Sequence, residues 1–254
     1  MATLEKTRLH LVDALRGLAV IVMVWYHLMW DLVYIYGVSA PWFMDERGFI
    51  LQRSIRWSFL LISGFCFRLG GRKYRRGLLT LGCSVVITLV TLVTLPKTPI
   101  HFGVLTLIGS ATILTALLDK LLEKWDPWLG LGLSLALFLL TVELEIGRIG
   151  FCGLFSVAAP GWLYRDMVTA FLGFPAKGFV SSDYVPLIPW LFVFWMGYFS
   201  FRLAERGGLL RYLTRPRIPV LDWIGRRSLW IYMAHQPVLY GILWVLDLIL
   251  KIER

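Results

Sequence analysis

The stretch GLAVIVMVWYHLMWDL (residues 17–32) is hydrophobic enough for a membrane span, yet it carries His27 and Asp31. Asp13 and Arg16 lie just before it. At about 100° per residue these four side chains project within about 60° of one another, so they form a polar stripe on an apolar helix. Arg16 precedes His27 by about 16 Å of helix rise. The stripe is therefore predicted to run from near one membrane surface into the opposite half of the bilayer.

The composition extends this interpretation to the whole chain. The 254 residues are 58% hydrophobic and only 17% charged, with a mean hydropathy of +0.70. Soluble domains carry about 25% charged residues, and long apolar runs are typical of membrane spans. We therefore expect an all-α fold, a polytopic transmembrane helical bundle that forms a single domain over residues 1–254. About seven spans are predicted, at residues 10–36, 50–69, 77–95, 100–118, 127–142, 184–203 and 228–250.

A further apolar segment, residues 150–174, is interrupted by Pro160, Gly161, Arg165 and Asp166. We expect it to be re-entrant or interfacial, since irregular backbone is tolerated at membrane depth only where protein or a water-filled cavity covers it. If the segment crossed the membrane once, the arginine-rich loop 202–227 would move to the external side.

The formal net charge of +10 fits a bilayer partner and no nucleic acid, because basic residues collect in the cytoplasmic loops of membrane proteins. Fifteen lysines and arginines fall on the predicted side of the N-terminus and seven on the other side. This bias predicts a multi-pass protein of the cell (inner) membrane, with the N-terminus cytoplasmic and the C-terminus external. The cysteines have no metal-ligand spacing, so no metal is expected.

An ionisable residue deep in the bilayer costs roughly 2.5–3.5 kcal/mol, so several on one face indicate a shared polar site. Asp31 lies one turn after His27 and can orient its imidazole, which makes His27 a candidate general base. Arg56, Asp183 and Tyr184 are expected at a similar depth and are further catalytic candidates. Structural roles are the alternative: a hydrogen bond between helices for His27, a loop cap for Asp183 and an interfacial aromatic residue for Tyr184.

The last predicted helix contains RRSLWIYMAHQPVLYG (residues 226–241). Its histidine lies about 12 Å inside the predicted cytoplasmic end, and the following proline frees a carbonyl and can bend the helix. This pattern indicates a cytoplasm-facing ligand pocket with cationic anchors, or else a structural histidine. The candidate ligand-binding residues are Arg16, Arg226, Arg227, His235 and Gln236.

Five motifs resemble, in order and spacing, the heparan-alpha-glucosaminide N-acetyltransferase catalytic-domain family, and its prokaryotic members are the most similar. They are VDALRGLAVIVMVWYHLMWDL, FLLISGFCFRL, HFGVLTLIGSATIL, DYVPLIPWLFVFWMGY and GRRSLWIYMAHQPVL, and the resemblance covers about residues 9–245. The spacing of Arg16 and His27 also resembles the first-helix signature of the acyltransferase-3 membrane enzymes, which belong to the same broad superfamily.

The resemblance implies an integral membrane acyltransferase. Acyl-CoA, usually acetyl-CoA as co-substrate, would bind from the cytoplasm at Arg16 and the basic loops, since phosphates prefer such donors. The acyl group would pass to the amine or hydroxyl of a sugar or glycan on the far side. His27 would serve as base, and Arg56 or Tyr184 would stabilise the oxyanion. A covalent acyl-histidine is equally compatible.

The chain departs from the lysosomal family member, whose catalytic histidine lies further past the first core helix. No histidine occurs between His27 and His101. Either His27 takes that role, or His101 reaches the site, or the chemistry differs.

Two other classes remain open from the residues alone. Intramembrane histidines and proline-broken helices also mark transporters and proton or solute pathways, although the two halves of this chain carry unlike motifs. The third possibility is an inactive relative that binds a lipid or partner. A homo-oligomer is compatible with each class.

Overall fold

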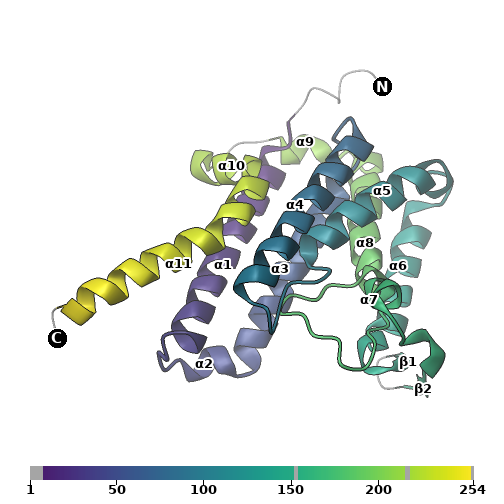
Figure 1. Ribbon diagram of the computed structural model, residues 1–254. Helices are drawn as coiled ribbons and strands as arrows, with labels where there is room; N and C mark the ends of the chain where they lie inside the picture. The colour runs from purple at the N-terminus through teal and green to yellow at the C-terminus, as the bar shows by residue number, and fades with distance from the viewer. Residues whose placement is uncertain (1–7, 152–153, 215–217, 253–254) are drawn as a thin grey trace. The chain divides into compact units, whose positions relative to one another are not determined.

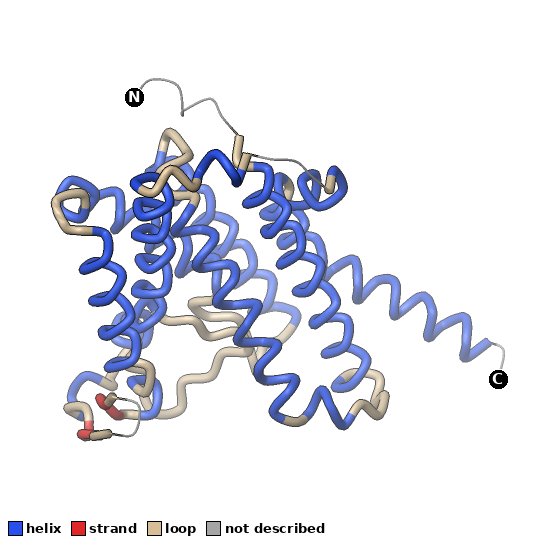
Figure 2. Tube along the Cα trace, turned by 180° about the vertical axis from the view of Figure 1, so that it is seen from behind, coloured by secondary structure: helices blue, strands red, loops and turns tan. Residues whose placement is uncertain are grey.

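The computed structural model describes residues 8–151, 154–214 and 218–252, and their regular secondary structure is almost wholly helical (Figure 1 and Figure 2). The two termini, for which opposite sides of the membrane are predicted, lie outside the described residues at 1–7 and 253–254. This content confirms the predicted all-α class. In chain order the elements are α1 (His10–Tyr34), α2 (Pro41–Met44), α3 (Glu46–Phe65), α4 (Lys73–Thr94), α5 (Val104–Leu122), α6 (Pro127–Thr141), η2 (Leu144–Ile146), β1 (Arg148–Gly150), β2 (Ser156–Ala158), η3 (Gly161–Leu163), α7 (Met167–Leu172), α8 (Leu187–Arg206), α9 (Leu210–Leu213), α10 (Pro219–Arg226) and α11 (Ser228–Ile252).

Among the described residues, six helices are long and apolar enough to span a membrane. They are α1, α4, α5, α6 with its extension to Ile146, α8 and α11, and they correspond to six of the seven predicted spans. The remaining predicted span, 50–69, corresponds to α3, which has the 20 residues of a span but carries Arg47, Arg53 and Arg56. Its length therefore suffices for a crossing, while its hydropathy is lowered by these charges.

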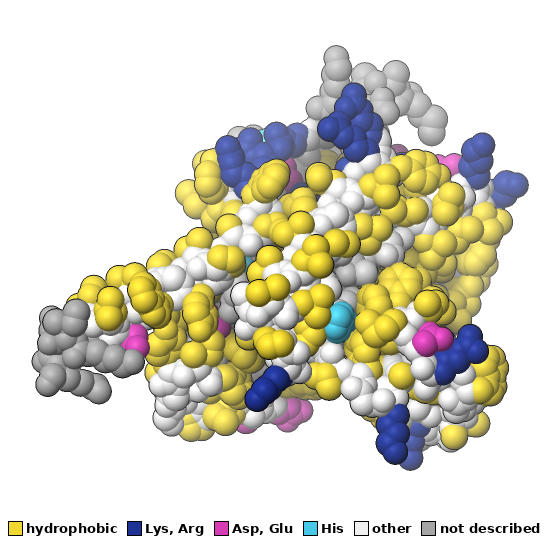
Figure 3. Space-filling model, in the orientation of Figure 1, with side chains coloured by type: hydrophobic (Ala, Val, Ile, Leu, Met, Phe, Trp, Pro, Cys, Tyr) yellow, Lys and Arg dark blue, Asp and Glu magenta, His cyan; other side chains and the backbone are white. Residues whose placement is uncertain are grey.

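Large hydrophobic side chains cover the outer flanks of the candidate spans. Val93 on α4 is 81% exposed and Trp244 on α11 is 59% exposed. Figure 3 shows this apolar cover running along both helices. Soluble monomers rarely expose contiguous apolar surface of this kind, whereas lipid tails solvate it at no cost. The exposed flanks and the span lengths identify a multi-pass membrane protein.

The predicted interfacial segment, 150–174, consists of short elements in its described part. Strands β1 and β2 pair antiparallel, with Arg148 opposite Ala158. The turn of η3 and the six-residue helix α7 follow. The backbone N–H of Thr169 donates to the Asp166 side chain at the start of α7, and this hydrogen bond lowers the pKa of Asp166. No described helix here approaches the roughly 20 residues of a crossing.

The chain divides into two compact units. The first contains the described residues up to Phe59 and from Leu209 onward, and the second contains residues 60–208. The expectation of a single domain stays a prediction.

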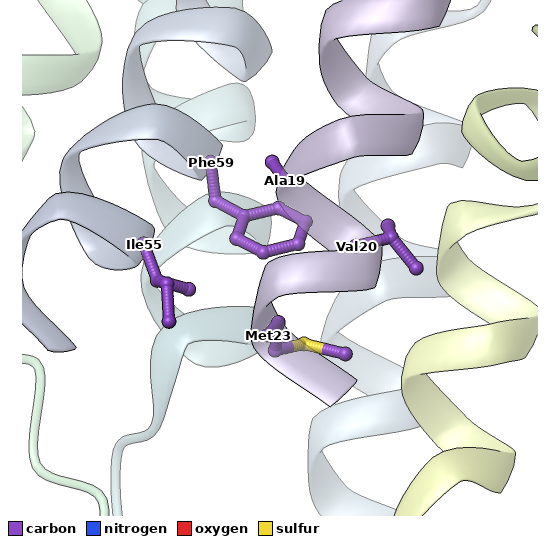
Figure 4. Close-up of a cluster of buried hydrophobic side chains, with 5 residues drawn as sticks. All are labelled: Ala19, Val20, Met23, Ile55 and Phe59. Carbon is purple, nitrogen blue, oxygen red and sulfur yellow. The ribbon is translucent and has the colours of Figure 1, made fainter. Parts of the chain in front are cut away.

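In the first unit, α1 packs its buried face against α3. Val20 and Met23, each only 1% exposed, form one buried cluster with Ala19 and with Ile55 and Phe59 of α3 (Figure 4). Residues four apart share a helix face, so the buried face of Met23 continues directly into His27 and Asp31. The apolar packing of α1 thereby fixes the direction in which its polar stripe points.

The start of α1 also packs tightly against α10. A Cβ on Gly17 would collide with the backbone carbonyl of Leu221, and one on Gly225 would collide with the carbonyl of Asp13. The two glycines therefore allow the backbones of α1 and α10 to touch directly, which brings α10 to the first turns of α1.

In the second unit, α4 packs on α5, and α6 packs on α8. Asp119 of α5 accepts a hydrogen bond from the Tyr198 hydroxyl of α8 at 2.8 Å and pairs with Lys73 of α4 at 2.5 Å. One carboxylate therefore joins three helices, and its two oxygens are both used.

Candidate active site

The polar stripe of α1 ends in a carboxylate that is completely buried. Asp31 has no exposed surface, and its Oδ1 accepts a hydrogen bond of 2.8 Å from Nε2 of Gln236 on α11. The two residues are 205 positions apart in the chain. A charge taken out of water is tolerated when it is hydrogen-bonded, so Gln236 is the residue that supports Asp31 at this depth.

A second contact lies beside the first. The imidazole rings of His27 and His235 meet edge to face, with centroids 4.7 Å apart and planes at 75°. His235 immediately precedes Gln236 on α11, and His27 lies one turn before Asp31 on α1. We call these four residues the polar cluster.

The backbone fixes the tautomer of both imidazoles, that is, which nitrogen of the neutral ring carries the hydrogen. Nδ1 of His27 lies 2.9 Å from the carbonyl oxygen of Met23, and Nδ1 of His235 lies 2.6 Å from that of Tyr232. A carbonyl oxygen can only accept, so each Nδ1 carries the hydrogen. Each Nε2 of the neutral ring therefore holds the lone pair, which is the form a general base or nucleophile requires.

Three acceptor atoms of the polar cluster are buried without a hydrogen-bond partner among the described residues. They are Oδ2 of Asp31, Nε2 of His235 and Oε1 of Gln236. The Gln236 amide donates its N–H group to Asp31, so its own oxygen, Oε1, receives no hydrogen bond from the described residues. A buried acceptor without a partner costs about 1–3 kcal/mol, and such groups mark strain, catalysis or an absent binding partner. The polar cluster is therefore complementary to a group that donates hydrogen bonds.

The opposite end of the α1 stripe is rich in charge. Asp13 pairs with Arg8 at 2.9 Å and with Arg16 at 3.5 Å. His10 Nδ1 lies 2.8 Å from Oδ2 of Asp222 on α10. The pairing of His10 with Asp222 could not be predicted from the sequence, because nothing local links two residues 212 positions apart.

The predicted anion anchors at the C-terminal end of α10 have partners in the first unit. Nε of Arg226 donates to the carbonyl oxygen of Asp222 at 3.2 Å, and the guanidinium of Arg227 lies 4.3 Å from the ring centroid of Trp223. Arg226 and Arg227 therefore lie at the end of the unit to which Arg16 also belongs, since α10 packs on the first turns of α1.

The other predicted catalytic residues do not belong to the polar cluster. Arg56 is half-buried on α3, next to the core residue Ile55. Asp183 and Tyr184 belong to the second unit, where Asp183 accepts from the backbone N–H of Val104 at 3.4 Å and the Tyr184 hydroxyl donates to the carbonyl of Ala170. Burial raises the pKa of the Tyr184 phenol above its usual range. Their catalytic roles stay predictions.

The fold and the polar cluster define a multi-pass helical membrane protein with a histidine and carboxylate site between two membrane helices. The sequence model of the family described as "Heparan-alpha-glucosaminide N-acetyltransferase, catalytic" matches residues 8–237. The chain belongs to this family, as its five motifs predicted, and membership implies a membrane acetyltransferase. No curated protein and no solved structure matches the chain. The matched range includes all four residues of the polar cluster.

Proposed function

We propose that the protein transfers an acetyl group from acetyl-CoA on the cytoplasmic side to a sugar amine or hydroxyl on the other side of the membrane. The observation that carries the proposal is the polar cluster, which lies in the region matched by an acetyltransferase family and offers imidazole lone pairs beside a buried carboxylate. The acyl-CoA end is the basic end of α1, where Arg16 would meet phosphates.

In the direct route, Nε2 of His27 takes the proton of the acceptor amine or hydroxyl as the acceptor attacks the thioester carbonyl. The new C–N or C–O bond forms, the C–S bond breaks, and the proton passes from His27 to the departing sulfur. Asp31, held by Gln236, stabilises the imidazolium that forms in between. In the alternative route Nε2 of His27 attacks the thioester carbonyl first, the C–S bond breaks and CoA leaves as the thiolate. The acceptor then attacks the acetyl-imidazole, the N–C bond to His27 breaks, and the acceptor proton passes to the thiolate.

The polar cluster favours an amine as acceptor. An amino sugar binds as an ammonium group, which carries three N–H donors, whereas a hydroxyl carries one. The ammonium group gives up one proton to water before its nitrogen attacks the thioester. The cluster holds three buried acceptors that need donors, and one belongs to a carboxylate that attracts a positive charge. We therefore expect a larger kcat/KM for an amino sugar than for the same sugar with a hydroxyl at that position.

The test is acetyl transfer by purified full-length protein, with His27→Ala compared with His101→Ala. Loss of a general base or nucleophile should lower kcat by about 10²–10⁴-fold, while His101→Ala should keep the parent rate. Parent-like turnover by a folded His27→Ala protein would remove the assignment. Loss in His101→Ala alone would move the chemistry to that histidine. Solute flux in proteoliposomes without any acyl donor would instead favour a transporter.

A further inference from the structure

We propose that the segment Leu209–Trp230 lies in the headgroup layer of the bilayer and binds anionic phospholipid headgroups. The segment contains α9, α10 and the start of α11, and the proposal concerns its described residues, 209–214 and 218–230. It does not rest on the proposed acetyl transfer, and it assigns Arg227, a candidate anchor for acyl-CoA, to a lipid headgroup.

The segment exposes large apolar side chains although its two short helices, of four and eight residues, cannot span a bilayer. The other face of α10 packs against α1, and Asp222 and Gly225 are buried there. The outward side chains are 45–67% exposed, and they are Leu209, Tyr212, Ile218, Val220, Trp223 and Trp230. A helix with one face on protein and an outward apolar face needs a second apolar environment.

Arginines are interleaved with this apolar face, and two of them stack on its aromatic rings. The guanidinium of Arg211 lies 4.8 Å from the ring centroid of Tyr212, and that of Arg227 lies 4.3 Å from the ring centroid of Trp223. Tryptophan and tyrosine concentrate at headgroup level, and arginine pairs well with phosphate oxygens. Figure 3 shows Lys and Arg side chains gathered over the end of the first unit that carries α10.

The depth agrees with this placement. Helix α10 touches α1 at Gly17, which precedes His27 by about 15 Å of helix rise. If α10 marks the membrane surface, His27 lies near the middle of a hydrocarbon core about 30 Å thick.

A phospholipid is the occupant that the surface fits. The exposed Ile218, Val220 and Trp223 require hydrocarbon, and the neighbouring arginines require an anion, so a single ligand must supply both. A soluble anion such as CoA supplies phosphates but leaves these apolar side chains in water. Anionic lipids attract basic segments by about 1 kcal/mol per Lys or Arg.

The first test compares Arg211→Gln/Arg227→Gln with Arg47→Gln/Arg165→Gln as the matched control. Arg47 and Arg165 are also exposed, but each is paired with a neighbouring aspartate. Phosphatidylglycerol is titrated into full-length protein in micelles of a zwitterionic detergent, and retained lipid is counted by native mass spectrometry. The first pair should weaken binding about 30-fold, and the control pair should not. Equal binding by both variants, or displacement of the lipid by acetyl-CoA or inorganic phosphate, would overturn the proposal.

The second test does not depend on charge. The difference in emission between the parent and Trp223→Phe isolates the fluorescence of Trp223 in vesicles that contain brominated phosphatidylcholine. Bromine near the headgroup end of the acyl chain should quench this difference more strongly than bromine near the chain end. If neither lipid quenches it and aqueous iodide does, Trp223 faces water and the proposal fails.

Discussion

Asp31 is the residue whose position needs the strongest functional reason. It is fully buried on a membrane helix, with one oxygen bonded to Gln236 and the other without a partner among the described residues. A charged side chain at this depth costs roughly 2.5–3.5 kcal/mol on insertion scales. Even whole buried ion pairs can often be replaced by well-packed hydrophobic residues of similar volume without loss of stability, so stability alone does not explain why a carboxylate stands here.

We predict that Asp31→Asn separates function from stability. The amide oxygen of asparagine still accepts the Gln236 hydrogen bond, so the thermal unfolding midpoint should be unchanged or higher. Without the negative charge, the preference for an amine over a hydroxyl acceptor should shrink at least about tenfold, the equivalent of 1.4 kcal/mol. The measurement is the ratio of kcat/KM values for the two acceptors. Asp222→Asn, the same change at another buried carboxylate of the first unit, should keep the parent ratio.

At the scale of elements, the contact of α1 with α10 depends on backbone proximity. Gly17 and Gly225 stand where any Cβ would meet a carbonyl of the partner helix. Backbone atoms cannot rotate away as a flexible side chain can, so the helices would have to separate. That movement would also disturb the pair of His10 with Asp222, which bridges the same two helices.

We predict that Gly225→Ala lowers the free energy of unfolding by about 1–3 kcal/mol, the usual cost of overpacking. Gly82→Ala on α4 is the matched control, because a Cβ there meets no atom within 4 Å. That variant should be neutral or gain up to about 1 kcal/mol from helix propensity. Denaturant unfolding in one detergent compares the two proteins. A Gly225→Ala protein as stable as the parent would show that α1 and α10 are not in backbone contact.

At the scale of the whole molecule, the orientation in the membrane follows from charge and from the number of crossings. Six described helices qualify as spans, and α3 has the length for a seventh. Seven crossings put the two chain ends on opposite sides, whereas six or eight put them on the same side. The short elements of the described part of 150–174 favour an odd number.

We predict that reporter fusions will place the loop around residues 71–77 and the loop 202–227 in the cytoplasm, and the C-terminus outside. Positive charges retain loops on the cytoplasmic side. A fluorescent protein that folds only in the cytoplasm and a phosphatase active only outside give opposite readouts at each position. A cytoplasmic C-terminus would mean that α3 does not cross. An external 202–227 loop would mean that 150–174 crosses.

The sequence by itself determined the helices, the membrane environment, the family and the polar stripe of α1. These features depend on neighbours within one or two turns: a run of apolar residues favours a span, and residues one turn apart share a face. That His27 and Asp31 share one face of α1 could be predicted in this way. The sequence also predicts that His235 and Gln236 of α11 line the donor pocket, or that the histidine is structural, and the donor role stays a prediction.

Only the tertiary structure decided that Gln236 holds Asp31 and that His235 meets His27. Contacts between residues about 200 positions apart depend on the rotation and axial register of two helices, and packing at other positions sets both. In this protein that packing includes the apolar face around Met23 and the glycine contact between α1 and α10. For Asp183 and Tyr184 the sequence predicts only a depth in the membrane similar to that of His27. Depth alone does not specify which residues a side chain contacts. The periodicity of a helix predicts which of its own residues share a face, whereas the contacts between two helices depend on how the helices pack together.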